Sequence, residues 1–252
     1  VPTDFNPVIK RMGLEQTLVS IPAAEVTSLL PTKRLPFTSG HTNFFPYPPE
    51  ALEFARGMVK HEDKRLREII ASVRAKHPDV LVQLNHPRHD DTLSGELPSD
   101  YEDHIHNGEF LEHMGVAGHP YQPDLPIDSS PNNTLVEADP VTGIRDIDFD
   151  LLEVINPGYD NYQSRLDAVR KDWLSFIKQG FKIVGVANSD SHGYHEQVGV
   201  PRTMVAMLDD SIAGFNQDEF IASLKQGNAY GSNGPLIEVS LNGHEMGSTM
   251  SG

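Results

Sequence analysis

Residues able to bind a metal or a substrate follow short apolar segments at four places in this sequence. In each case the apolar segment has the length of a strand, and the polar residues come where the strand would end. The segments are 17–24, which leads to Glu25 and then to an expected turn at Gly40 and His41; 80–84, which leads to 85–88; 149–155, which leads to 156–158; and 182–187, which leads to 188–192. The recurrence of the pattern indicates one shared site.

Asp190 and His192 form the most specific of these signals. They are spaced by two residues, so on an extended backbone both side chains face the same side. A carboxylate with an imidazole suits Zn²⁺, Mn²⁺ or Fe²⁺, and a carboxylate such as Glu25 can bridge two ions. Taken alone, Glu25 or His41 is more typical of a solvated residue or a turn, and the case rests on the set.

Other histidines give weaker signals. His104 and His106 form an H-x-H pair, but no apolar strand precedes it, and a surface loop is the favoured interpretation. The order His192, His195, Glu196 is not the helical H-E-x-x-H of a metalloprotease. The glycine-rich segment 227–234 leads into a strand and not a helix, so it lacks the phosphate-binding arrangement of a P-loop and is interpreted as a loop beside the site.

The elements that would position these residues alternate between strand and helix. Apolar spacing predicts helices over about 51–76 and 162–179, the second ending at Gly180, and a further strand over 236–241. Such alternation, with nearly continuous apolar strands, favours an α/β fold with a parallel sheet covered on both faces. Residues 88–148, rich in Pro, Asp, Gly and His, are expected to form a long insertion that covers the mouth of the site.

Composition narrows the class of protein further. The chain has 252 residues, and we expect one domain over 1–252. No apolar run approaches the roughly 20 residues of a membrane span. A net charge of -16 disfavours nucleic acid as a partner, whereas a small substrate, even an anionic one, fits if cations are bound. Without cysteine, any metal must be held by imidazole and carboxylate groups. Compartment and oligomeric state stay open.

Both ends are interpreted as internal to a longer polypeptide. The sequence starts at Val1 and Pro2 without a methionine, and it stops just after the expected strand 236–241. A signal peptide upstream, and with it a secreted or periplasmic location, is therefore an open alternative.

Seven short motifs, in this order, resemble one family. The set resembles the CehA/McbA type of metallohydrolase in the polymerase-and-histidinol-phosphatase (PHP) superfamily, and it covers nearly the whole chain apart from the insertion. The motifs are AEVT (24–27), GHTN (40–43), NHPR (85–88), LEVIN (152–156), NSDSH (188–192), GVPRT (199–203) and SNGP (232–235).

The resemblance implies a distorted β/α barrel of the (β/α)7 type, with two or three divalent ions that activate water for hydrolysis of phosphate esters or of related ester and carbamate bonds. Zinc, manganese and iron are the expected metals. The residues that match the family's metal ligands are Glu25, His41, His86, Asp190 and His192, of which Glu25, Asp190 and His192 are expected to take part in catalysis. Arg88, Arg202 and Asn156 are the candidates for substrate binding.

One departure from the family pattern separates two hypotheses. The family opens with an H-x-H strand and an Asp-His motif, and this chain begins after both. We therefore expect a barrel that is incomplete at its N-terminus, partial metal occupancy, and little hydrolysis by residues 1–252 alone. The rival hypothesis is a non-catalytic metal-binding or ligand-binding domain with a degenerate PHP site. The reading frame upstream of Val1 would separate the two.

Overall fold

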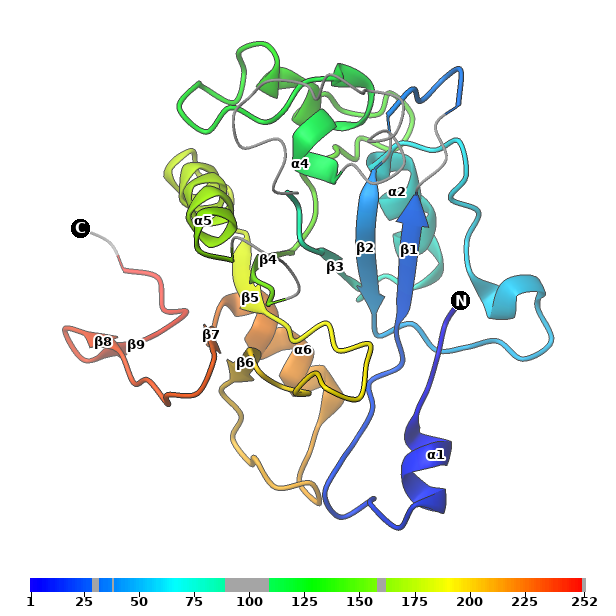
Figure 1. The fold of residues 1–252 in the computed structure, drawn as a ribbon, viewed down its shortest axis with the longest axis vertical. Coiled ribbons are helices and arrows are strands. Elements are labelled where there is room, and N and C mark those ends of the chain that lie inside the picture. The colour runs from blue at the N-terminus through cyan, green and yellow to red at the C-terminus, as the bar shows by residue number, and fades with distance from the viewer. Residues whose placement is uncertain (29–31, 38, 89–108, 158–161, 251–252) are drawn as a thin grey trace.

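A computed structural model describes residues 1–28, 32–37, 39–88, 109–157 and 162–250 (Figure 1). It confirms a mixed α/β fold built on a five-stranded sheet with the strand order β1-β2-β3-β4-β5. The sheet consists of β1 (Ala24–Ser28), β2 (Gly40–Phe45), β3 (Leu81–Leu84), β4 (Leu151–Ile155) and β5 (Val184–Ala187). Within the described ranges the strands close no barrel, so the barrel expected from the resemblance is not seen there.

The direction of the strands corrects the expectation of a parallel sheet. β2 is antiparallel to both of its neighbours, whereas β3, β4 and β5 run parallel to one another. β1 therefore points the same way as β3. Four of the five strands thus end at the same edge, and β2 begins there. The expected strands 80–84, 149–155 and 182–187 match β3, β4 and β5 closely.

Helices and smaller elements surround this sheet. α5 confirms the helix expected at 162–179, and Gly180, with φ of 90°, follows its last turn. The helices are α1 (Asn6–Arg11), α2 (Leu66–Lys76), α4 (Phe110–His113), α5 (Tyr162–Lys178) and α6 (Gln217–Gln226), with 3-10 turns η1 (Phe54–Gly57), η3 (Gly115–Ala117) and η4 (Asn132–Leu135). The described residues also form two small antiparallel pairs: β6 (Arg202–Val205) with β7 (Ala229–Ser232), and β8 (Ser240–Leu241) with β9 (His244–Glu245).

Four expected elements differ from the structure, and one of them is the glycine-rich segment 227–234, which was expected to be a loop but contains β7. The strand predicted at 17–24 lies later, at β1, so Glu25 is inside a strand and not at its end. The helix predicted over 51–76 is limited to α2, because the chain before it passes through left-handed backbone at Ala55, Arg56 and Asp63. Of the strand predicted at 236–241, only the two residues of β8 form.

The two faces of the sheet differ in composition. Alternate residues of the strands, such as Val26, Phe44 and Leu84, pack into the main hydrophobic core with α2 and α5. We call this the core face. Phe110, Leu111 and other residues of the segment 109–149 also belong to this core, so the described part of the expected insertion is not merely a polar cover. The rest of that insertion, 89–108, with His104 and His106, lies outside the described residues.

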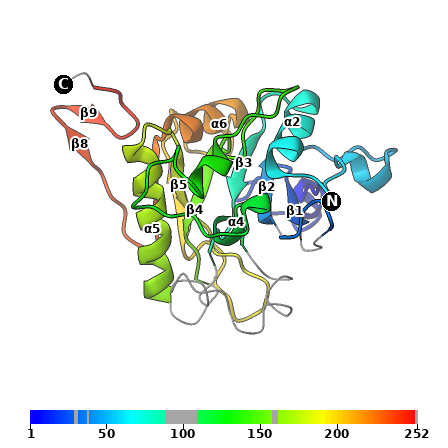
Figure 2. The same ribbon diagram turned by 90° about the horizontal axis from the view of Figure 1, so that it is seen from above.

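The opposite face, which we call the pocket face, is divided along the strands. Near one end Leu81, Leu151 and Val184 form a smaller apolar cluster with Ile221 and Leu224 of α6. Toward the shared edge the same face carries polar side chains, described below. Figure 2 shows β8 and β9 standing off to the side of α5, away from this sheet. In the described part of the chain no helix has both the length and the apolar character needed to cross a membrane.

Candidate metal centre

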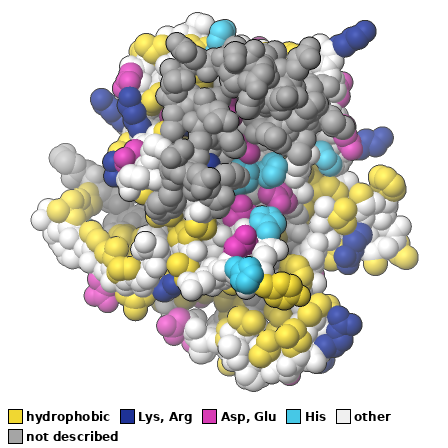
Figure 3. All heavy atoms as spheres, in the orientation of Figure 1, with side chains coloured by type: hydrophobic (Ala, Val, Ile, Leu, Met, Phe, Trp, Pro, Cys, Tyr) yellow, Lys and Arg dark blue, Asp and Glu magenta, His cyan; other side chains and the backbone are white. Residues whose placement is uncertain are grey.

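Three of the predicted ligands meet on the pocket face. Glu25, His41 and His86 each offer one ligand atom, and these three atoms lie within 4.8 Å of one another. Nδ1 of His41 is 3.5 Å from Oε1 of Glu25, and the rings of His41 and His86 are 4.8 Å apart between centroids. Figure 3 shows histidine and acidic side chains gathered in the middle of one face of the molecule.

The strand register explains why these residues meet. Glu25 of β1 is paired with Asn43 of β2, and Asn43 is paired with Gln83 of β3. His41 is two residues from Asn43 along β2, so it faces the same side of the sheet as Glu25. A chain of hydrogen bonds crosses this face: Nε2 of Gln83 donates to Oδ1 of Asn85, and Nδ2 of Asn85 donates to Oε1 of Glu25, each at 2.9 Å.

His86 reaches the cluster because the backbone leaves the extended conformation at this residue. Asn85 and His86 are consecutive, and on a regular strand their side chains would face opposite ways. His86 has φ of 23°, in the left-handed region, and both side chains line the same pocket. Such backbone strain in a residue with a side chain on Cβ is found preferentially at functional sites.

Glu153 of β4 holds this unusual turn in place. Its side chain is buried, with 3% exposed, and it accepts hydrogen bonds from the backbone N–H of His86, from Nδ2 of Asn156 at 3.1 Å and from Nδ2 of Asn188 at 3.0 Å. Burial raises the pKa of Glu153. The sequence analysis did not single out Glu153 as a functional residue, although the LEVIN motif contains it.

Asp190 joins the same pocket, whereas His192 does not join the cluster. Nδ2 of Asn156 lies 3.3 Å from Oδ2 of Asp190, and Asp190 has φ of 46°, a second left-handed residue at the site. The His192 side chain is 77% exposed, and its Nδ1 lies 2.6 Å from the backbone oxygen of Asp190. The described structure thus brings Glu25, His86 and Asp190 to one pocket, places His41 next to Glu25 and His86, and leaves His192 at the surface.

The predicted substrate-binding residues have different positions. Arg88 is buried away from the pocket, where its guanidinium binds both carboxylate oxygens of Asp172 and the backbone oxygen of Tyr121. These contacts give Arg88 a structural role, and Arg88 does not line the pocket, which differs from the expected role in substrate binding. Asn156 orients carboxylates, as described above. Arg202 lines the pocket, and its guanidinium donates to the backbone oxygens of Gly199 at 3.1 Å and Gly234 at 3.2 Å.

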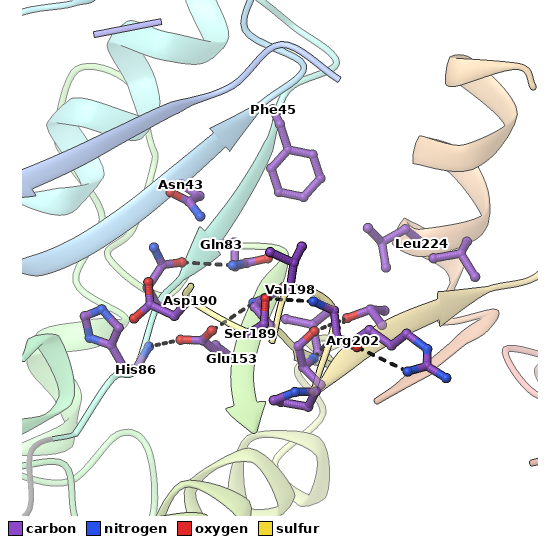
Figure 4. Close-up of a pocket in the computed structure, with 18 of the residues that line it drawn as sticks. Asn43, Phe45, Gln83, His86, Glu153, Ser189, Asp190, Val198, Arg202 and Leu224 are labelled. Carbon is purple, nitrogen blue, oxygen red and sulfur yellow. Dashed lines mark hydrogen bonds between the residues drawn. The ribbon is translucent and has the colours of Figure 1, made fainter. Parts of the chain in front are cut away.

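The pocket has the size of a small-molecule site. Its volume is about 550 Å³, and besides the acidic residues it is lined by the amides Asn43 and Gln83 and by apolar side chains such as Phe45. Figure 4 shows His86, Asp190 and Glu153 together on one side of the pocket, with Arg202 and Leu224 on the other. Arg202 is therefore placed to contact a part of a ligand remote from His86.

Electrostatics at the cluster favour a bound cation. The hydrogen bond with His41 holds the pKa of Glu25 below its ordinary value, against the opposing effect of partial burial. Burial opposes the charged form of His86, but neighbouring carboxylates, Glu109 first among them, raise its pKa to about 9. The shift of His86 reflects the negative charge of the carboxylates around it, and a divalent cation would replace the proton that His86 otherwise binds.

Comparisons with known proteins add no relative. No protein-family model, no curated protein and no solved structure matches this chain. The assignment of function therefore rests on the residues and their geometry.

Proposed function

We propose that this chain is a divalent-metal-dependent hydrolase of the PHP type, which acts on phosphate esters or on related ester or carbamate bonds. The observation that carries the proposal is the convergence of Glu25, His41 and His86, which are far apart in the sequence: their ligand atoms lie within 4.8 Å of one another, and Glu25 and His86 line a pocket. The ordered motifs of the sequence support the family, and the pocket supports a small substrate.

The donor set fits a metal such as Zn²⁺, Mn²⁺ or Fe²⁺. Two imidazoles and one carboxylate are the ligands of a well-known class of catalytic zinc sites, in which three protein ligands leave a position for water. A cation held there would supply Lewis acidity, which would lower the pKa of a bound water toward about 7 and polarise a phosphoryl or carbonyl oxygen. Asp190 would contribute to a second ion, as the resemblance implies.

The residues of the chain divide the remaining tasks. Glu25 is fixed by Asn85, and His86 is fixed by Glu153, so both ligands are held in place before a metal arrives. Asp190 is oriented by Asn156 and can accept a proton or a ligand bond at the pocket. Across the pocket, Arg202 provides a positive charge for an anionic group of the substrate, and Phe45 provides an apolar contact.

Metal binding and hydrolysis test this proposal together. The metal-stripped chain is titrated with Zn²⁺ and Mn²⁺, and hydrolysis of bis(4-nitrophenyl) phosphate is measured with and without metal. The assay is repeated on the protein that the natural reading frame encodes. We expect metal binding that Glu25→Gln and His41→Asn each weaken by at least about 100-fold, because one of three ligands is lost. Turnover by the protein that the natural reading frame encodes should require metal and the same residues.

Matched controls are available at residues of the same types outside the pocket. Glu238→Gln and His244→Asn change exposed side chains and should leave metal affinity unchanged. Unaltered metal affinity in Glu25→Gln and His41→Asn would contradict the proposed metal centre. If the protein that the natural reading frame encodes binds metal but turns over no phosphodiester, carboxyl ester or carbamate substrate, this would contradict catalysis and favour the non-catalytic metal-binding domain.

A further inference from the structure

The buried carboxylate of Glu109 lies beside the candidate metal centre, and packing in the hydrophobic core does not explain why it is there. Oε1 of Glu109 lies 3.0 Å from Nδ1 of His86, and both side chains are buried. The other oxygen, Oε2, is buried and has no hydrogen-bond partner in the described part of the chain. Burying a carboxylate with an unsatisfied oxygen is costly, so such a group points to a role other than stability.

The local structure fixes the backbone of Glu109 at this position. Glu109 precedes α4, and the Glu112 carboxylate accepts the backbone N–H of Glu109 at 2.8 Å. Leu111 of the same helix donates its backbone N–H to the oxygen of Pro87, one residue after His86. The start of α4 and the chain around His86 are therefore held together by backbone contacts.

Gly40 provides the space that Glu109 needs. A Cβ atom at residue 40 would lie only 2.4 Å from Oε2 of Glu109, and Gly40 has φ of 64°. A residue with a side chain would clash with the carboxylate and would also be strained in this conformation. Gly40 immediately precedes His41, so the glycine lets the Glu109 carboxylate approach the strand that carries another ligand.

We propose that Glu109 is a positioning residue for His86: its carboxylate accepts the proton on Nδ1 and so directs Nε2 of the same ring to the metal. This inference rests on the proposed function, because it assigns a role toward the metal held by Glu25, His41 and His86. Histidine ligands commonly donate their second ring N–H to a carboxylate, which fixes the tautomer and the orientation of the ring. Segment 109–149 thereby contributes to the metal centre as well as to the core.

Zinc affinity and the coordination of His86 test the role of Glu109. Removal of a carboxylate that orients a ligand weakens metal binding by about 10- to 100-fold. We expect this loss in Glu109→Ala and a smaller one in Glu109→Gln, whose amide oxygen can still accept the proton of Nδ1. Long-range ¹H–¹⁵N spectra of the zinc-loaded protein should show His86 with a protonated Nδ1 and a coordinated Nε2. His86→Gln assigns the signals.

A control on the same segment and a stability measurement complete the design. Asp124→Asn removes an exposed carboxylate that pairs with Lys171 at 2.6 Å, and zinc affinity should not change. Thermal unfolding of each metal-free variant shows the folded fraction for which affinities are corrected. Unchanged zinc affinity in Glu109→Ala, or coordination of His86 through Nδ1 in the unmodified protein, overturns the inference. Because Glu25→Gln tests the metal centre itself, failure of either idea can be recognised separately.

Discussion

Both faces of the sheet carry charged groups, but the contacts of these groups differ between the faces. Behind the core face, Arg88 and Asp172 satisfy one another, and Arg65 pairs with Asp146. On the pocket face, Glu25 and His41 are partly exposed and keep ligand atoms directed to a common point. The comparison teaches that burial of a charge alone does not identify a functional residue. What distinguishes the site is that several potential ligand atoms lie within 4.8 Å of one another.

Backbone conformation supports the same distinction. His86 and Asp190, which both line the pocket, adopt left-handed φ values of 23° and 46°. Strain of this kind persists only where surrounding contacts enforce it, and here Glu153 and Asn156 supply those contacts. Neither Arg88 nor Asp172, in contrast, is among the described residues with a left-handed φ. The pocket face is therefore organised for precise placement of groups, and the core face for stability.

The largest effect should follow from breaking the pair behind the core face. Arg88→Ala leaves Asp172 buried without its partner, which should cost about 3–5 kcal/mol of the free energy of unfolding. Urea denaturation monitors this loss. The double variant Arg88→Met with Asp172→Leu should regain most of it, because apolar groups can replace a buried pair. Zinc affinity of the folded fraction should stay unchanged; a specific loss of affinity would show that Arg88 belongs to the site.

Replacing Glu153 should have a smaller effect, and on zinc affinity instead of on the free energy of unfolding. Glu153→Gln replaces one acceptor oxygen by an NH₂ group that faces donors, so the turn at His86 should be held less firmly. We expect zinc affinity to fall by about 10-fold. Calorimetric titration of the metal-stripped chain measures it, with Glu238→Gln as the control. A loss of stability with full zinc affinity would place Glu153 with the structural pairs and would break the comparison between the faces.

The fold was predictable from the sequence where the residues whose apolar spacing predicts an element are also the buried ones. β3, β4, β5 and α5 have continuous or helically spaced apolar residues, and these are indeed buried. The expected strand at 17–24 was wrong because its apolar residues, Leu18 and Val19, are exposed in the structure. β2 was missed because Gly40 and His41 were interpreted as a turn. The antiparallel direction of β2 follows from tertiary pairing, which no local pattern expresses.

The candidate site was predictable to a similar degree. Four site residues could be named from the sequence because they follow apolar segments or lie within motifs of the family that the chain resembles. They are Glu25, His41, His86 and Asp190. Glu109 could not, because it lies in a stretch whose composition indicates only loops, and its role depends on a contact across many residues. Arg88 was assigned to substrate from its motif, yet its partner Asp172 lies on α5, where only the structure reveals the pairing.

The smallest expected effect concerns two buried histidines whose pKa values are shifted in opposite directions. Carboxylates raise the pKa of His86 at the pocket to about 9 against the effect of burial, whereas burial lowers the pKa of His113 on α4, where the ring stacks on Phe37. His113 thus stays neutral in the folded state but binds a proton in the unfolded state below its ordinary pKa of about 6.5. Its contribution to stability is present above that pH and is lost as the pH falls through the lowered folded-state pKa.

Replacing this histidine should therefore flatten the response of stability to acid. His113→Phe keeps an aromatic ring against Phe37 and removes the titrating group, so its urea midpoint should fall less between pH 7 and pH 5 than that of the unmodified chain. His244→Asn, at an exposed position, should leave the response unchanged. Parallel pH curves for His113→Phe and the unmodified chain would show that His113 carries no such linkage. In that case the comparison of the two histidines would fail, because burial would not lower the pKa of His113 as proposed.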